Sequence, residues 1–264
     1  MRALPRRWRI AVILAVAIAA LGIAFVVPPM AQDPIYHDFA DQRGFWGIPN
    51  FSDVVSNAPF LLVGGFGLAA LFGRSARRES RPDLLTLPFA VYFAAVGLVA
   101  LGSTYYHQDP SNETLFWDRV PMSIAFMALF AAIIIDRIDE KAGRILLPVL
   151  IVLGIASVVY WHLTERTGNG DLRLYALVQF FPMLAVPLIC LLFPPRRLDC
   201  RYLVPMFLLY GAAKVFEHFD DQIFMLLGPF ISGHSLKHLF AAMAALMALP
   251  MLNKADGSDI RGRA

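Results

Sequence analysis

The sequence contains little cysteine and little charge for its length. Only Cys190 and Cys200 are cysteines among the 264 residues, and 16% of residues are charged. Two cysteines offer no disulfide framework of the kind that stabilises small secreted domains. The sequence also lacks a helical repeat and a low-complexity tract, and its net charge of +3 does not indicate a nucleic-acid partner. A disulfide-stapled domain and a nucleic-acid-binding protein are therefore not expected.

Apolar residues are abundant instead. They make up 58% of the chain, and the mean hydropathy is +0.60, which exceeds what a soluble domain of this length needs. A helix crosses the hydrocarbon of a bilayer with about 20 predominantly apolar residues, because lipid offers the backbone no hydrogen-bond partner. Eight segments meet this criterion: 10–28, 54–72, 87–103, 120–135, 145–161, 174–193, 202–216 and 235–252.

The first of these segments allows two interpretations. A basic start at residues 2–9 followed by an apolar run is also typical of a cleavable signal peptide. The run is long for that purpose, and the sequence Pro29-Met-Ala31 is a poor cleavage site, so a retained helix is favoured. The predicted fold is an all-α polytopic membrane protein with four parts: an N-terminal membrane helix or signal anchor (1–30), an extracytoplasmic segment (31–53), a seven-helix core (54–252) and a cytoplasmic tail (253–264).

Lysine and arginine are distributed unevenly between the two sides of the predicted membrane. Cytoplasmic loops are enriched in these residues. If the N-terminus is cytoplasmic, the same side receives the basic clusters at 2–9, 74–81, 137–144, 196–201 and 254–263, whereas the opposite loops hold few. Both termini are therefore expected in the cytoplasm. The short chain and simple loops favour a bacterial inner-membrane protein.

Ionisable side chains gather near the outward ends of three predicted helices. Such residues are costly at membrane depth and usually mark a site or a pathway. Ser103 and His107 are four residues apart, about 40° around a helix, so they share a face. His234 and His238 have the same spacing, and Asp118 opens the helix that follows His107. On the predicted topology all five lie toward the periplasmic face.

This set of residues suits a catalytic zinc site. Three neutral imidazoles with an open position for water form a known arrangement, and histidines four apart on a helix can bind one metal. Asp118 would accept the proton of the water, while Ser103 would donate a hydrogen bond to it or to the oxyanion. A single histidine near the interface is more often a satisfied polar residue, and we assign His37, His162 and His218 to that class.

The same residues carry a family resemblance. The stretches Gly102-Ser-Thr-Tyr-Tyr-His107, Leu115-Phe-Trp-Asp-Arg-Val-Pro-Met122 and Ser232-Gly-His-Ser-Leu-Lys-His238 closely resemble the alkaline ceramidases. That family belongs to a group of seven-helix membrane hydrolases that includes the adiponectin and progestin receptor-like proteins. The resemblance covers about residues 38–252. It implies zinc bound by His107, His234 and His238, with Ser103 and Asp118 as the catalytic pair.

The resemblance also implies a calcium site before the first helix of the core. Asp38 and Asp41 match acidic family positions, and Asn50 stands where the family usually has an acid. Asp53 and nearby backbone carbonyls would complete the set of oxygen ligands that a hard cation requires. Arg43 departs from the pattern, because animal members have a side-chain oxygen there. A capped polar turn without calcium is the alternative interpretation.

The activity that the resemblance implies is zinc-dependent hydrolysis of a linear amide C–N bond. Attack of zinc-bound water would cleave an N-acyl lipid such as ceramide into a fatty acid and a sphingoid base. The alternative is a zinc-containing seven-helix receptor or lipid-binding protein without turnover. Lys214 and Glu217, three residues apart, are read as an intramembrane ion pair, with a proton relay through Asp220 as the second possibility.

Overall fold

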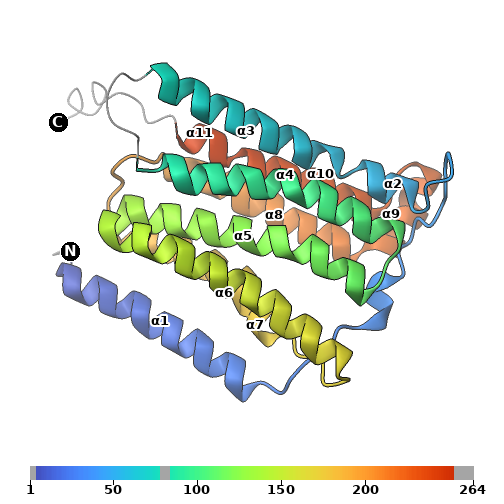
Figure 1. The fold of residues 1–264 in the computed structure, drawn as a ribbon, viewed down its shortest axis with the longest axis horizontal. Helices are drawn as coiled ribbons and strands as arrows, with labels where there is room; N and C mark the ends of the chain where they lie inside the picture. The colour runs from blue at the N-terminus through green and yellow to red at the C-terminus, as the bar shows by residue number, and fades with distance from the viewer. Residues whose placement is uncertain (1–3, 78–83, 253–264) are drawn as a thin grey trace.

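The structure is a computed structural model that describes residues 4–77 and 84–252, and within those residues it is all-helical, without a β-strand (Figure 1). The predicted tail 253–264 and the charged residues at 78–83 lie outside the described residues. The long helices run side by side along a common direction. The elements are α1 (Arg6–Val26), η1 (Pro34–His37), α2 (Phe51–Val55), α3 (Ala58–Arg77), α4 (Thr86–Gln108), α5 (Asn112–Arg137), α6 (Glu140–Arg166), α7 (Arg173–Leu192), η2 (Cys200–Tyr202), α8 (Leu203–His218), α9 (Asp220–Leu227), η3 (Gly228–Phe230), α10 (Gly233–Leu246) and α11 (Ala248–Met251).

All eight apolar segments predicted from the sequence are helical. Among the described residues, six helical spans are long and apolar enough to cross a membrane: α1, the combined span 51–73, and α4 to α7. The helix α8 has 16 residues and α10 has 14, so both are shorter than these spans. The polytopic helical architecture is thus confirmed, whereas a core of seven spans remains a prediction.

Two interruptions were not expected. The predicted segment 54–72 breaks at Ser56 and Asn57, which separate α2 from α3. The last segment breaks at Met247, so α10 is followed by the short α11. The short helix α9, between two predicted spans, was also missed because eight residues carry too weak a periodic pattern. The first break matters for the site described below.

The helix α5 lies at the centre of the bundle. Of its apolar window, 72% is buried, and it packs against α4, α6 and α7. Its small residues Ala125, Ala128, Ala131 and Ala132 are buried, and small side chains allow neighbouring helix backbones to approach closely. The helix α1 lies at the edge, beside α7, and Ile13 is its one buried residue. The core therefore forms around α5, with α1 as a peripheral addition.

The two ends of the bundle differ in character. At one end, Arg6 at the start of α1 donates a hydrogen bond to the carbonyl of Ile138 between α5 and α6 and forms an ion pair with Asp139. Arg9 donates to the carbonyl of Leu192 at the end of α7. The C-terminal end of α4 and the start of α10 lie at the opposite end, together with α2 (Figure 1). The predicted site residues therefore lie far from the basic connections.

This arrangement predicts which end of α6 is accessible from outside the cell. In a background with Cys190 and Cys200 replaced by serine, Asn169→Cys should react with a membrane-impermeant maleimide in intact cells made permeable only in the outer membrane. Lys141→Cys, at the other end of α6, should react only after lysis, because positive residues favour the cytoplasmic side. Both positions are exposed, and labelling after lysis is the control for reactivity. The reverse pattern would refute the orientation.

Candidate metal centre

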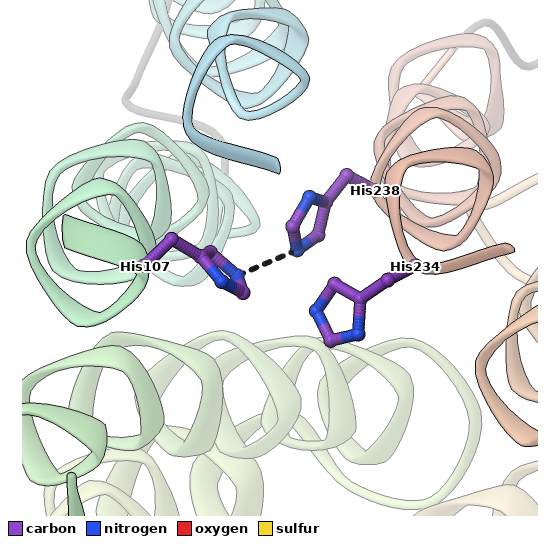
Figure 2. Close-up of side chains that lie close together, drawn as sticks. All are labelled: His107, His234 and His238. Atoms are coloured by element: carbon purple, nitrogen blue, oxygen red, sulfur yellow. Dashed lines mark hydrogen bonds between the residues drawn. The ribbon is translucent and has the colours of Figure 1, made fainter. Parts of the chain in front are cut away.

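Three buried histidines converge at one end of the bundle. His107 lies in the last turn of α4, and His234 and His238 lie in the first turns of α10. Figure 2 shows their rings directed toward one another from the two helices. One nitrogen from each ring can be chosen so that all three lie within 4.8 Å of one another. The side chains are almost fully withdrawn from solvent.

The distances fit a tetrahedral metal. His107 Nε2 and His238 Nε2 are 3.2 Å apart, and the three ring centroids are 4.8 to 4.9 Å apart. Two Zn–N bonds of about 2.0–2.1 Å at a tetrahedral angle place their nitrogens about 3.3 Å apart. In addition, Nδ1 of His107 is buried without a hydrogen-bond partner. The donor set therefore suits a zinc ion held by three imidazoles.

A serine orients one of these rings. Ser56 Oγ donates to the carbonyl of Asp53 (3.0 Å) and lies 2.8 Å from Nδ1 of His238. Since the single hydroxyl proton is used toward Asp53, Oγ accepts from Nδ1–H of His238. Nε2 of His238 then keeps its lone pair and faces His107. This is the support that metal-binding histidines typically receive from a second layer of residues.

The break between α2 and α3 explains how Ser56 reaches His238. Asp53 in α2 is fully buried, and its Oδ1 accepts from Ser232 Oγ (3.1 Å) and Ser235 Oγ (2.6 Å) at the start of α10. Ser232 is also the N-cap of α10, accepting from the backbone of Ser235. These bonds tie α2 to the helix that carries two of the histidines. From the sequence, Asp53 was expected only as a calcium ligand, and no role was predicted for Ser56.

The segment before α2 covers the histidines. The ring of Phe39 lies 4.6 Å from the rings of both His107 and His234. Asn50 donates from its side chain to the carbonyl of His107 (2.8 Å). Asp220 accepts from the backbone of His234 (2.7 Å) and from that of Ala40 (3.1 Å). Residues 39–50 thus cover the cluster at this end of the bundle.

Ser103 and Asp118 lie together on α4 and α5. The Ser103 hydroxyl lies near the Asp118 carboxylate, and both side chains are buried and line the same cavity. Gly102 allows this proximity, because a Cβ at that position would lie 2.2 Å from the carbonyl oxygen of Trp117. The crossing of α4 and α5 at Gly102 therefore sets the position of Asp118, a requirement that the sequence pattern did not reveal.

A cavity of about 330 Å³ opens from this end into the bundle. Ser103, Asp118 and His238 line its polar end. Its other walls are mainly apolar, and its size lies in the range of about 300–1,000 Å³ typical of small-molecule sites. The apolar lining includes Val96, Val99, Phe130, Val186, Ala241 and Ala245. A long apolar chain attached to a polar group matches this distribution.

The predicted ion pair of α8, Lys214 with Glu217, is part of a larger polar cluster. Glu217 binds Lys214 Nζ at 2.6 Å and Lys237 Nζ at 2.9 Å, and it accepts from the Tyr36 hydroxyl at 3.1 Å. Lys237 Nζ also lies 3.1 Å from Nε2 of His234. The ion pair between Lys214 and Glu217 is confirmed. Asp220 belongs instead to the backbone contacts described above, and Lys237 was assigned no role from sequence.

The predicted calcium ligands Asp38, Asp41 and Asn50 have protein partners of their own. Asp41 binds Arg43 through both oxygens, at 2.6 and 2.7 Å. Burial raises the pKa of the Asp41 carboxyl, but hydrogen bonds from Arg43 and Ser52 outweigh burial and hold that pKa below its ordinary value. Asp38 accepts from Gln42, and the Asn50 amide is directed to His107. The guanidinium of Arg43 thus pairs with the Asp41 carboxylate in place of a cation. These contacts do not support a calcium site.

The remaining histidines lie outside the cluster. His37 Nδ1 lies 2.9 Å from the Tyr106 hydroxyl, and its Nε2 lies 3.0 Å from the Asn112 side chain. Burial lowers the pKa of His37, which favours its neutral form. His162 pairs with Glu113 at 3.3 Å. Both ring nitrogens of His37 are thus satisfied, whereas Nδ1 of His162 is buried without a hydrogen-bond partner.

The fold and the site define a polytopic helical membrane protein with a candidate metal centre at one end of the bundle. A family model described as Ceramidase matches residues 47–193, which is more than half of the chain. The chain belongs to the ceramidase family, and the resemblance noted in the sequence is confirmed. The matched region contains Ser103, His107 and Asp118 and ends before His234. No curated protein matches the chain.

The close approach at Gly102 can be tested by adding a methyl group. Gly102→Ala should destabilise the protein by about 2–3 kcal/mol, because a new Cβ forces two backbones apart in a packed interior. Gly65→Ala is the control, since a Cβ there meets nothing within 4 Å. The thermal unfolding midpoint in detergent measures the difference. Equal midpoints for the two variants would show that this crossing does not constrain the fold.

Proposed function

We propose that this protein is a zinc-dependent membrane amide hydrolase, ceramidase-like, that cleaves an N-acyl lipid such as ceramide into a fatty acid and a free amine. The observation that carries the proposal is the position of the histidine cluster. One of the three histidines, His238, lines the polar end of a mainly apolar cavity together with Ser103 and Asp118. Membership of the ceramidase family supports a hydrolase that acts on amide bonds and a lipid substrate.

His107, His234 and His238 would hold the zinc ion. Bound zinc supplies Lewis acidity, which polarises an amide carbonyl and lowers the pKa of water toward about 7. Ser56 keeps Nε2 of His238 available by accepting from Nδ1–H. Phe39 covers two of the imidazoles and limits access of bulk water from the outward side. These residues form and protect the centre.

Asp118 would carry out the proton transfers. The Asp118 carboxylate accepts a proton from the attacking water and then delivers it to the nitrogen of the leaving amine. Ser103, which lines the cavity beside Asp118, would donate a hydrogen bond to the water or to the oxyanion. The acyl chain would lie along the apolar wall of the cavity. The basic loops at the far end favour a site on the periplasmic side of a bacterial inner membrane.

Metal content and hydrolysis should be lost together when a ligand is removed. The purified protein should contain about one zinc per chain and release fatty acid from N-acylated sphingoid bases or related lipid amides. His234→Ala should lose both properties, because two imidazoles hold zinc far less tightly than three. His218→Ala, an exposed histidine outside the cluster, should retain both. Elemental analysis and mass spectrometry of released fatty acid are made on one sample.

Full hydrolysis by metal-free protein would end the proposal. Zinc at about one per chain without release of fatty acid from any lipid amide would favour the rival interpretation, a zinc-containing receptor or lipid-binding protein without turnover.

Removal of the proposed base should separate the metal from the chemistry. Asp118→Asn keeps the size of the side chain but cannot accept a proton, so it should retain zinc and lose about 10²–10⁴-fold in kcat. Stopped assays for fatty acid give kcat, and elemental analysis gives the zinc content. Unchanged turnover in Asp118→Asn would remove the base assignment while leaving the metal centre.

A further inference from the structure

One cation in the cavity has no partner that matches its charge. Arg119 lines the cavity next to Asp118 and is 6% exposed. Among the described residues its one hydrogen bond runs from Nη2 to the side-chain oxygen of Gln32 (2.5 Å). Nη1 is buried without any hydrogen-bond partner. An unpaired donor of a buried guanidinium is costly unless another group completes it.

The surroundings hold this guanidinium in a fixed position. Its carbon lies 4.1 Å from the ring centroid of Trp161, 4.7 Å from that of Tyr175 and 5.8 Å from that of Tyr36. Such aromatic faces attract a cation but do not neutralise it. One carboxylate oxygen of Glu165 accepts hydrogen bonds from the Trp161 indole and from the backbone N–H of Gln32. The guanidinium is therefore oriented by neutral groups.

The other charges of the cavity compensate Arg119 only in part, because Asp118 interacts electrostatically with both Lys237 and Arg119. Lys214 and Lys237 share the single carboxylate of Glu217. Asp118 is the remaining acid that lines the cavity. The described lining residues thus carry three basic and two acidic side chains, and a bound divalent ion would add further positive charge. A buried space with excess positive charge favours an anionic occupant.

We propose that Arg119 forms an anion subsite and that the preferred substrate is a lipid amide with a carboxylate on its amine half, as in an N-acyl amino acid. The inference rests on the proposed amide hydrolysis and narrows its substrate class. The planar guanidinium presents paired donors that match a carboxylate. Because Arg119 and Asp118 line the same cavity and interact electrostatically, the carboxylate would lie only a few bonds from the amide.

Two lipids that differ only in this group provide the test. N-palmitoylglycine carries a carboxylate, and N-palmitoylethanolamine carries a hydroxyl on an amine half of the same length. The unmodified zinc-loaded protein should show about ten- to hundred-fold higher kcat/KM for the first, the effect of one hydrogen bond to a charged group. This comparison requires no variant to fold.

Variants then assign the preference to Arg119. Arg119→Gln should lose most of the preference while keeping zinc and hydrolysis of N-palmitoylethanolamine, and Arg119→Lys should keep a part of it through charge alone. Arg166→Gln is the control, because Arg166 is exposed and pairs with Glu113. The readout for each variant is the ratio of kcat/KM for N-palmitoylglycine to kcat/KM for N-palmitoylethanolamine. A smaller amount of folded protein lowers both values equally and leaves this ratio unchanged.

The outcomes separate this inference from the proposed function. Equal or faster hydrolysis of N-palmitoylethanolamine, or a preference unchanged in Arg119→Gln, would overturn the anion subsite and leave the hydrolase intact. If neither lipid is cleaved, the hydrolase proposal fails for both, and binding decides the inference. In that case N-palmitoylglycine should raise the unfolding temperature more than N-palmitoylethanolamine at equal concentration, and an equal shift would refute the subsite.

Discussion

The buried residue Asp53 connects α2, the start of α10 and Ser56, which together position the histidine cluster. Its carboxylate accepts hydrogen bonds from the hydroxyl groups of Ser232 and Ser235 at the start of α10. Its backbone carbonyl accepts a hydrogen bond from the hydroxyl of Ser56, and Ser56 in turn orients His238. One residue in a five-residue helix thus fixes both the position of α10 and the direction of an imidazole. In an apolar interior an unpaired polar group is costly, so each of these bonds constrains the others.

The parts of the fold that the sequence predicted depend on local patterns. Apolar runs of bilayer length located the helices, and a spacing of four residues placed His234 and His238 on one face of α10. To place His107 near this pair, it was enough to predict that the end of α4 and the start of α10 lie on the same side of the membrane. Such features need no knowledge of which helices are neighbours.

The parts that it could not predict depend on contacts between distant segments. Arg119 is enclosed by Trp161 and Tyr175, which come from α6 and α7. Ser56 belongs to no motif in the sequence, and it reaches His238 at the break between α2 and α3. Arg43 appeared as a departure from a calcium pattern, whereas the structure shows that it binds the carboxylate itself. For each of these three residues, side-chain contacts seen only in the structure determine the structural role.

The contrast between α1 and α5 bears on how freely the sequence can vary. Since α1 buries only Ile13, most of its surface requires no more than an apolar character and a sufficient length, which many sequences supply. Most residues of α5 instead contact other helices on several sides, and each must have a particular size. Random substitutions should therefore accumulate in α1 and be eliminated from α5, so that the two helices diverge at very different rates even though both cross the same bilayer.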